Sequence, residues 1–351
     1  MPTKVIDLFC GVGGLTHGLQ LSGLNVVAGF DFEESCQYAY EKNNDAIFVH
    51  KDITELTGHE LMEYYEDGDI RILVGCAPCQ PFSKYTHRYR KEGHTDSKWQ
   101  LLYSFGNLIG ETLPHIVSME NVPELATQTV FRDFIKKLND NNYSVSWSIA
   151  YAPDYGVPQH RKRLILLATR FNKELHLIDP LYNSETYITV KDAIGELEYI
   201  EDGECSQSDI MHQSCKLSEI NRKRIRQSIP GGTWREWDEE LQLDCHKKSS
   251  GKSYPSVYGR MKWDAPSPTI TTQFFGFGNG RFGHPEQNRA LSLREGAILQ
   301  SFPPNYKFVP ENGVMNKRKI GVQIGNAVPV ELGRVIGLSI QEHLKEVGIN
   351  G

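Results

Sequence analysis

The chain has 351 residues, of which 39% are hydrophobic and 23% are charged. A chain of this length and composition can bury one large core and a smaller second one, and bulk disorder is excluded. The formal net charge of −6 disfavours a uniformly basic nucleic-acid-binding surface, and no apolar window approaches the length of a membrane span.

In the first half of the chain, short apolar runs alternate with amphipathic stretches. We expect strands at 5–9, 26–30, 46–49, 70–74, 116–119 and 164–168. The stretches between them predict helices at 15–21, 33–42, 101–111 and 131–138. Alternation of this kind is typical of an α/β fold with a doubly wound, mostly parallel sheet.

After Arg170 the chain becomes polar and irregular. We interpret 171–260 as a small inserted domain, with 1–170 and 261–351 forming the large one. Within it, 229–237 (IPGGTWREW) predicts a turn with exposed aromatic side chains, although a small core built on the tryptophans is an equal alternative. Apolar order returns in two expected helices, 293–299 and 328–344, the second with Pro329 in its first turn.

Local basic clusters qualify the negative net charge, because screening limits electrostatic reach to about 8–10 Å. They lie at 84–91, 160–163, 222–226 and 246–252. A single cluster of this kind is usually a solvated surface. Four clusters, several of them beside the motifs below, favour a phosphate-bearing partner.

The first expected strand runs into a glycine turn that contains Gly11, Gly13 and Gly14. Thr16 stands where a dinucleotide fingerprint has its third glycine. Asp31 ends the next strand, and Asp52-Ile53 follows the third. Each aspartate alone could simply cap its strand. Together, these strand ends predict a crevice for a nucleoside cofactor without a pyrophosphate, such as S-adenosylmethionine.

The fourth strand leads into 75–83 (GCAPCQPFS), where Cys76 and Cys79 form a CxxC pair. A zinc site needs about four ligands, and no second pair follows. A redox dithiol would leave the glycine turn without a role, and an inert buried Cys79 is a minor alternative. The seven cysteines are scattered without disulfide spacing, which indicates a reducing cytosol.

Several short motifs follow one another along the chain. They are the glycine turn, Pro78-Cys79-Gln80, Glu120-Asn121-Val122, Gln159-x-Arg161-x-Arg163, the segment 266–272 and Gly325-Asn326-x-Val328-Pro329. These motifs, and their order, resemble those of the DNA (cytosine-5)-methyltransferases of bacterial restriction-modification systems. The matches extend from Asp7 to Pro329. The resemblance implies a class I S-adenosylmethionine-dependent methyltransferase fold, with 171–260 as its target-recognition domain.

For the reaction, the resemblance implies that the Cys79 thiolate adds to C6 of a flipped-out cytosine. Glu120 would donate a hydrogen bond to N3 and Arg163 would contact O2. Arg161 would contact a phosphate or the surroundings of the sulfur. Cys76 is expected only to pack beneath the loop.

We expect two further sets of contacts. The cofactor S-adenosylmethionine, with S-adenosylhomocysteine as product, would touch Phe9, Gly11, Gly13, Gly14, Asp31, Phe32, Asp52, Ile53, Pro78, Leu101 and Asn326. DNA would touch Ser83, Lys84, Arg88, Gln159, Arg222, Arg224, Arg226, Trp234 and Arg235. The segment 83–99 suits a loop that closes over the base, although its residues 96–99 depart from the family pattern.

The expected partners are double-stranded DNA and a cognate restriction endonuclease, with no metal and no membrane. We expect a monomer in the bacterial cytosol, associated with the nucleoid. Rival interpretations are a tRNA cytosine-5 methyltransferase, a DNA-binding regulator with this fold and, more distantly, a nicotinamide-dependent oxidoreductase. The intact set Cys79, Glu120, Arg161 and Arg163 argues against the regulator, and the long insert argues against the tRNA enzyme.

Overall fold

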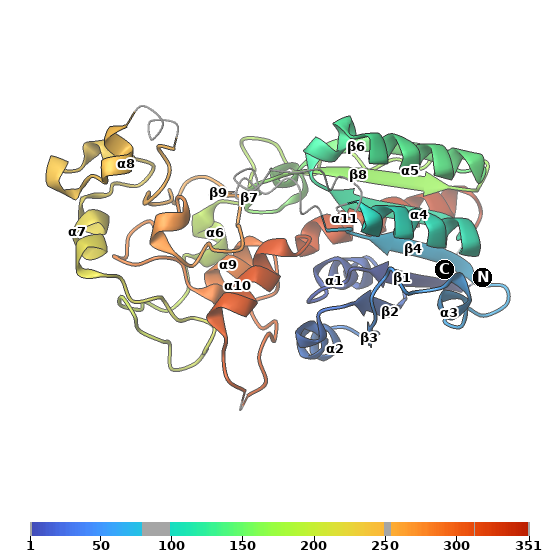
Figure 1. Ribbon diagram of the computed structural model, residues 1–351, viewed down its shortest axis with the longest axis horizontal. Helices are drawn as coiled ribbons and strands as arrows, with labels where there is room; N and C mark the ends of the chain where they lie inside the picture. The colour runs from blue at the N-terminus through green and yellow to red at the C-terminus, as the bar shows by residue number, and fades with distance from the viewer. Residues whose placement is uncertain (1, 79–98, 249–253, 312, 350–351) are drawn as a thin grey trace. The chain divides into compact units, whose positions relative to one another are not determined.

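A computed structural model describes residues 2–78, 99–248, 254–311 and 313–349. The chain divides into two compact units (Figure 1). The first comprises Met1–Tyr151, Lys162–Pro180 and Val328–Gly351, and the second comprises Ala152–Arg161 and Leu181–Ala327.

The second unit extends past the boundary that we predicted at residue 260. Residues 261–327, expected to return to the large domain, make their contacts within the second unit. One reason is Arg260, whose buried guanidinium donates to the carbonyls of Ile225, Ser228 and His284. Its backbone also bridges to Pro230 and Gly283. Long-range bonds of this kind cannot be read from hydrophobic periodicity.

The first unit is built on a seven-stranded sheet with the order β3-β2-β1-β4-β5-β8-β6. Its strands are β1 Thr3–Leu8, β2 Val26–Asp31, β3 Ile47–His50, β4 Ile70–Gly75, β5 Ile116–Asn121, β6 Ser144–Tyr151 and β8 Lys162–Thr169. Neighbouring strands are parallel except at β8, which runs antiparallel to both β5 and β6. The predicted doubly wound, mostly parallel α/β fold is confirmed.

Strand β6 was not predicted, for a physical reason. It lies at the edge of the sheet, and its sequence SVSWSIAY alternates serine with larger residues instead of forming an apolar run. Trp147 and Ile149 are exposed, at 47% and 41%. An edge strand is buried on fewer sides and therefore carries a weak hydrophobic signal.

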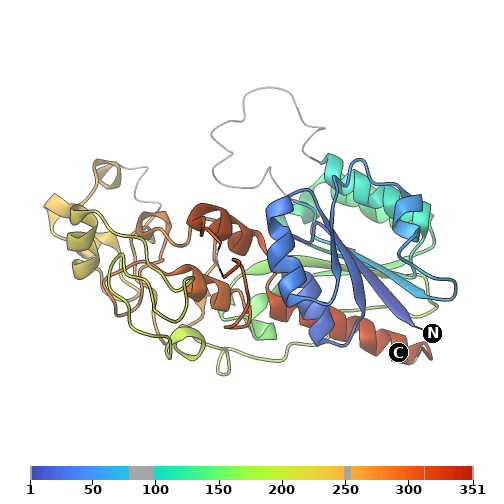
Figure 2. The same cartoon turned by 90° about the horizontal axis from the view of Figure 1, so that it is seen from below.

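Helices cover both faces of the sheet. They are α1 Gly14–Leu21, α2 Gln37–Asn43, α3 Gly58–Met62, α4 Gln100–Thr112, α5 Thr129–Asp140 and α11 Val330–Glu346, with 3-10 turns η1 Glu34–Cys36 and η4 Pro123–Thr127. Figure 2 shows α4 and α5 (teal) above the sheet and α11 (red) below it. Helix α1 packs along α11, and their backbones approach closely at Gly18, where an added Cβ would lie 2.2 Å from the carbonyl oxygen of Val330.

The second unit consists mainly of short elements. They are the paired strands β7 Gln159–His160 and β9 Ser267–Pro268, the helices α6 Val190–Ile194, α7 Glu219–Gln227, α8 Asp244–Lys247, α9 Leu293–Leu299 and α10 Lys317–Asn326, and the 3-10 turns η5 Ala152–Tyr155, η6 Trp234–Glu236, η7 Glu239–Leu241 and η9 Phe277–Asn279.

The two tryptophans of the predicted aromatic turn are buried, not exposed. Trp234 and Trp237 are each 4% exposed and pack with Leu241. Their indole nitrogens donate to the carbonyl oxygen of Tyr254 and to Ser228 Oγ, so the polar edge of each ring is also satisfied. The alternative that these tryptophans form a small core is therefore the correct one.

A buried ion pair anchors α9 in the second unit. The guanidinium of Arg289 makes two bonds to the carboxylate of Glu295, at 2.8 and 2.7 Å, and both side chains are 1% exposed. Glu295 also completes a capping box with Ser292 at the start of the helix. His284 Nε2 lies 3.7 Å from the same carboxylate. Breaking such a pair leaves an uncompensated charge in the core.

We expect Glu295→Gln to destabilise the second unit by ~3–5 kcal/mol. The substitution keeps the side-chain volume but leaves the buried charge of Arg289 without a negatively charged partner. Urea unfolding followed by tryptophan fluorescence measures this loss. The matched control is Glu239→Gln, which removes an exposed ion pair with Lys247 and should change stability by less than about 1 kcal/mol. Equal effects of the two substitutions would contradict the assigned role of the buried pair.

The same cluster predicts a pH dependence of stability. Burial lowers the pKa of His284 to about 4, below its ordinary 6.5, and Arg289 with its hydrogen bonds lowers the pKa of Glu295 to about 2, below 4.5. From pH 6.5 downward the unfolded chain therefore binds more protons than the native one, so stability falls on acidification. His284→Asn should flatten the loss between pH 6.5 and 4; an unchanged slope would refute this.

Candidate active site

The glycine turn lies at the carboxyl ends of β1 and β2. Phe9, Gly11 and Gly13 adopt positive φ angles of 63°, 51° and 86°, which allow the chain to turn sharply into α1. The Gly11 amide donates to Asp31 Oδ2 at 2.8 Å, and the Glu33 amide donates to Oδ1 at 2.8 Å. Burial raises the pKa of Asp31. Asp31 therefore ties the turn to β2 in addition to capping its own strand.

The other predicted cofactor contacts in the first unit surround this turn. Asp52 Oδ1 accepts bonds from Thr54 N and Oγ1, which is a local cap. Ile53 is buried and Phe32 is 65% exposed, so an apolar ring face is available beside Asp31. The half-buried members of the set are Phe9, Pro78 and Leu101. Asn326 is exposed and ends α10 in the second unit.

Sequence reasoning missed a polar group beneath the turn. Thr16 Oγ1 donates to Asp7 Oδ2 at 2.7 Å and lies 3.1 Å from the hydroxyl of Tyr40. Burial raises the pKa of Asp7 to about 7. The available signal was Thr16 itself, which breaks the glycine pattern because its hydroxyl fixes the start of α1 to the buried carboxyl group of β1.

A second cluster joins the ends of β4 and β5 to the start of β8. Gly75 pairs with Met119 in the sheet, so the next residues, Cys76 and Glu120, lie side by side. Because β8 is antiparallel, its first residues lie at this same edge. Arg163 Nε is 2.8 Å from Glu120 Oε1, and Glu120 is only 2% exposed. The structure therefore brings Glu120 and Arg163 of two separate motifs into contact.

Cys76 is not the packing residue that we expected. Its thiol donates to Glu120 Oε2 at 2.7 Å, so both carboxylate oxygens of Glu120 have a partner. Next to it, Asn121 Nδ2 donates to the Ala77 carbonyl at 3.1 Å and holds the loop against β5. Cys79, Ser83, Lys84 and Arg88 lie outside the described residues.

Gln159 and Arg161 form hydrogen bonds in the interior of the second unit. Gln159 is completely buried, donates to the Leu299 carbonyl and accepts from the Ile270 amide. Arg161 is 4% exposed and donates to the carbonyls of Ile270 and Ala327. The predicted DNA contact of Gln159 is therefore wrong, and the guanidinium of Arg161 is bound by carbonyl oxygens instead of facing a phosphate.

The predicted basic cluster of α7 separates into buried and exposed members. Arg224 is 8% exposed, donates to the Leu241 carbonyl and lies over the rings of Trp237 and Tyr258, which excludes the predicted DNA contact of its side chain. Arg222 forms an ion pair with Asp202. Arg226 is exposed.

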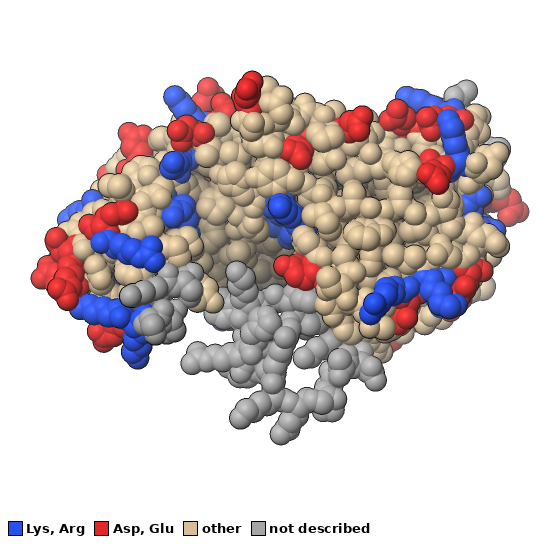
Figure 3. Space-filling model, turned by 90° about the horizontal axis from the view of Figure 1, so that it is seen from above, with Lys and Arg blue, Asp and Glu red and all other residues tan. Residues whose placement is uncertain are grey.

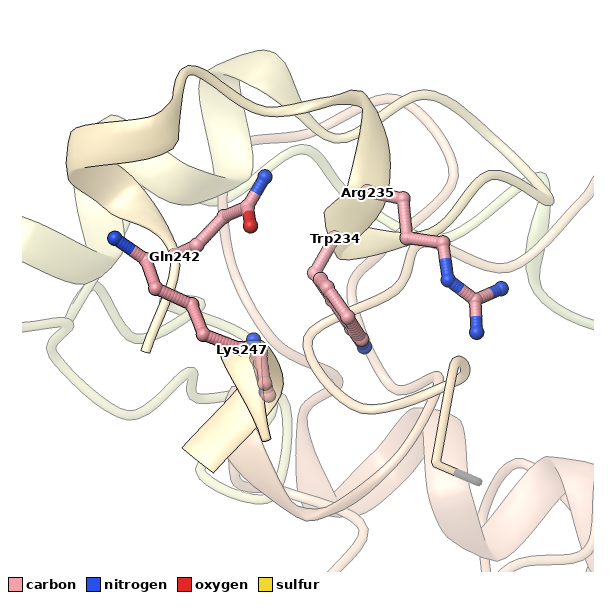
Figure 4. Close-up of a pocket in the computed structure, with 5 residues that line it drawn as sticks. Trp234, Arg235, Gln242 and Lys247 are labelled. Carbon is pink, nitrogen blue, oxygen red and sulfur yellow. The ribbon is translucent and has the colours of Figure 1, made fainter. Parts of the chain in front are cut away.

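A pocket of about 460 Å³ lies beside the buried tryptophans. It is lined by Trp234, Arg235, Gln242, His246 and Lys247. The Trp234 ring stacks on His246 with centroids 4.2 Å apart, and the Arg235 guanidinium lies 5.2 Å from the Trp234 centroid. In Figure 4, Trp234 lies between Arg235 on one side and Gln242 with Lys247 on the other. Burial of Trp234 leaves Arg235 and Lys247 as the exposed cations here.

Within the described ranges, no group of three or more His, Cys, Asp and Glu side chains is arranged to hold a metal ion. The helices of those ranges include none that is long and apolar enough to cross a membrane.

Comparisons with known proteins agree on one family. A Type II methylase of Herpetosiphon aurantiacus, M.HgiDII, is 54% identical over 98% of this chain and 97% of its own length. A Type II methyltransferase of Escherichia coli, M.Eco47II, is 31% identical over 98% of this chain and 80% of its own length.

Solved structures agree on the fold. An E. coli prophage protein assigned as a DNA modification methyltransferase has a TM-score of 0.72 at 21% identity, covering 98% of this chain and 99% of its own. The family model described as C-5 cytosine-specific DNA methylase matches residues 3–342. The chain therefore belongs to the C-5 cytosine-specific DNA methylase family and is a DNA (cytosine-5)-methyltransferase.

Proposed function

We propose that this chain modifies one cytosine of a specific double-stranded DNA sequence, using Cys79 as nucleophile and Glu120 as the group that acts at N3. The observation that supports this most strongly is the ion pair of Glu120 with Arg163 at the strand edge where the Cys79 loop begins. The match to the C-5 cytosine-specific DNA methylase model and the similarity to a Type II methylase support DNA over tRNA as substrate and activity over a purely regulatory role.

The chemistry requires a nucleophile because C5 of cytosine is itself unreactive. Attack of the Cys79 thiolate on C6 forms an S–C6 bond and moves the C5–C6 electron pair towards C5, while charge develops at N3. Glu120 in its protonated form stabilises that charge by donating its proton to N3, and it recovers this proton when the ring is restored. Arg163 holds Glu120 and contacts O2. Once C5 is methylated, loss of its proton restores the double bond and expels the thiolate.

The crevice at β1 and β2 fits S-adenosylmethionine, the methyl donor, which would supply an activated methyl group when bound. The fit rests on the Asp31 carboxylate, which can accept hydrogen bonds from ribose hydroxyls, and on the apolar side chains of Phe32 and Ile53 beside it. Asp52, Phe9, Pro78 and Leu101 would complete the pocket around the glycine turn. Asn326 stays a proposed contact on the motif alone.

Arg161 and Gln159 take a different role from the one expected. Their bonds to Ile270, Leu299 and Ala327 support a structural role in the second unit, next to the point where the chain enters β8. By holding that point, they would fix where Arg163 begins. We therefore propose that Arg161 positions the motif and touches neither phosphate nor cofactor.

The second unit is proposed to read the DNA sequence. On the face drawn in Figure 3, the lysines and arginines of the described residues stand among acidic side chains, so attraction to phosphates must act locally. The exposed cations Arg226, Arg235 and Lys247 are the best candidates for phosphate or guanine contacts. Ser83, Lys84 and Arg88 would follow the backbone near the flipped base.

The same relatives support a proposal for the biological setting. A protective methylase implies a cognate endonuclease that recognises the same sequence, and we propose such a partner for this chain. A monomer acting on DNA in the bacterial cytosol is sufficient for the reaction proposed, because all the groups assigned to it lie on one chain. Bisulfite sequencing of plasmid from cells that express the chain would reveal which cytosine is modified.

We expect Cys79→Ser to form no covalent adduct with DNA that contains 5-fluorocytosine at the target, because the adduct requires the thiolate. Glu120→Gln should keep cofactor binding but slow single-turnover methylation by about 10²–10⁴-fold. Cys245→Ser, at an exposed cysteine of the second unit, is the matched control and should behave as wild type. Methylation by Cys79→Ser at the wild-type rate would exclude this mechanism.

Arg235→Gln and Lys247→Gln should each weaken DNA binding and reduce the slope of log K against log salt concentration by about 1, because each removes one phosphate contact. Titrations at several salt concentrations measure the slope. Lys173→Gln, which removes a cation paired with Glu346 in the first unit, is the control. If Arg235→Gln and Lys247→Gln keep the wild-type slope, as the control should, the pocket region does not bind phosphate.

A further inference from the structure

The cysteine that the proposed reaction does not use is bonded to a residue that it does use. Cys76 Sγ lies 2.7 Å from Glu120 Oε2, and the thiol is the donor because a carboxylate oxygen can only accept. The contact is built into the sheet, because Gly75 of β4 pairs with Met119 of β5 and each is followed directly by one of the two residues. Cys76 reaches Glu120 from the neighbouring strand, not from an adjacent turn of the same chain segment.

The two oxygens of Glu120 contact groups from different strands, one by a hydrogen bond and the other by an ion pair. Oε2 accepts from Cys76 at the end of β4, and Oε1 faces Arg163 Nε at the start of β8, 2.8 Å away. A carboxylate that is only 2% exposed depends on such partners, since water cannot replace them. The thiol hydrogen bond on one oxygen and the arginine ion pair on the other hold the carboxyl group from two sides.

We propose that Cys76 is a positioning residue for Glu120, orienting its carboxyl group towards N3 of the target cytosine through the thiol hydrogen bond. This inference rests on the proposed role of Glu120. The two cysteines of the CxxC pair then have separate tasks, with Cys79 bonding to the base and Cys76 holding the carboxyl group that acts on it. No electron or bond is exchanged at Cys76.

A weak donor is sufficient for this task. The S–H group is a weak donor, so replacing its hydrogen bond by a contact with the incoming base costs little. Arg163 keeps its hold on the other oxygen during that exchange. The carboxyl group is therefore fixed before the base enters and remains able to turn towards it.

The test compares Cys76→Ala, which removes the donor, with Cys76→Ser, which keeps one. Loss of one neutral hydrogen bond from the transition state predicts a roughly 3–10-fold slower single-turnover methylation for Cys76→Ala. Cys76→Ser should stay within about twofold of wild type on the same reasoning. Cofactor and DNA dissociation constants and the thermal midpoint should be unchanged in both, which separates positioning from folding. Cys36→Ala, at another buried cysteine of the first unit, is the matched control.

A double-mutant cycle identifies the route of the effect. In a Glu120→Gln background, Cys76→Ala should slow the reaction by less than about twofold, because the group it positions has already been altered. An undiminished effect there, or a wild-type rate for Cys76→Ala alone, overturns the inference. If Glu120→Gln itself has the wild-type rate, the proposed role of Glu120 fails instead. Where the rate of Glu120→Gln is too slow to follow, formation of the 5-fluorocytosine adduct replaces it as the readout.

Discussion

The ion pair between Glu120 and Arg163 depends on the direction of one strand. In a wholly parallel sheet, β8 would begin at the edge opposite the carboxyl ends of β4 and β5, and Arg163 would lie a full strand length from Glu120. Because β8 runs antiparallel to β5, its first residues reach the edge where Glu120 ends its strand. The carboxylate can be buried there because a cation from a neighbouring strand compensates its charge.

Local order at that edge extends outward from the pair. Two hydrogen bonds attach residues 76–78 to β5. The Cys76 thiol donates to the Glu120 carboxylate, and the Asn121 side chain donates to the Ala77 carbonyl. Two residues before Arg163 in the chain, the Arg161 guanidinium donates to the carbonyl of Ala327. The Ala152 amide donates to the carbonyl of Arg161. These residues stand beside the points where the chain passes between its two compact units. In the Gln-x-Arg-x-Arg motif, Gln159 and Arg161 therefore belong to the second unit and Arg163 belongs to the first.

The sequence predicted best what depends on local pattern. The buried strands of the first unit and helix α9 lie in apolar stretches, so both were predicted close to their observed bounds. Glu120 and Arg163 were found together through motifs, without knowledge of β8's direction. Edge strand β6 and the five-residue helix α3 were not predicted, because neither buries enough side chains to give its sequence a hydrophobic periodicity.

Burial of polar side chains was the least predictable feature. Arg224 and Arg226 are two positions apart in one basic run, yet the first is buried against aromatic rings and the second is exposed. The sequence RKRIR contains no sign of this difference. It arises from Trp237 and Tyr258, which are distant in the chain, and from the Leu241 carbonyl that accepts the Arg224 bond. The same holds for Cys76, whose partner is 44 residues away.

The second unit shows why such buried polar groups matter there. Its helices α6 and α8 have five and four residues, lengths at which helices are unstable on their own. Order must therefore come from side chains such as Arg260, Arg289 and Glu295, which bond to several segments at once. The exposed cations proposed to meet DNA sit next to buried neighbours, Arg226 beside Ile225, Arg235 beside Trp234 and Lys247 beside His246. Exchange of an exposed side chain can then alter DNA contacts while its buried neighbour keeps the backbone in place.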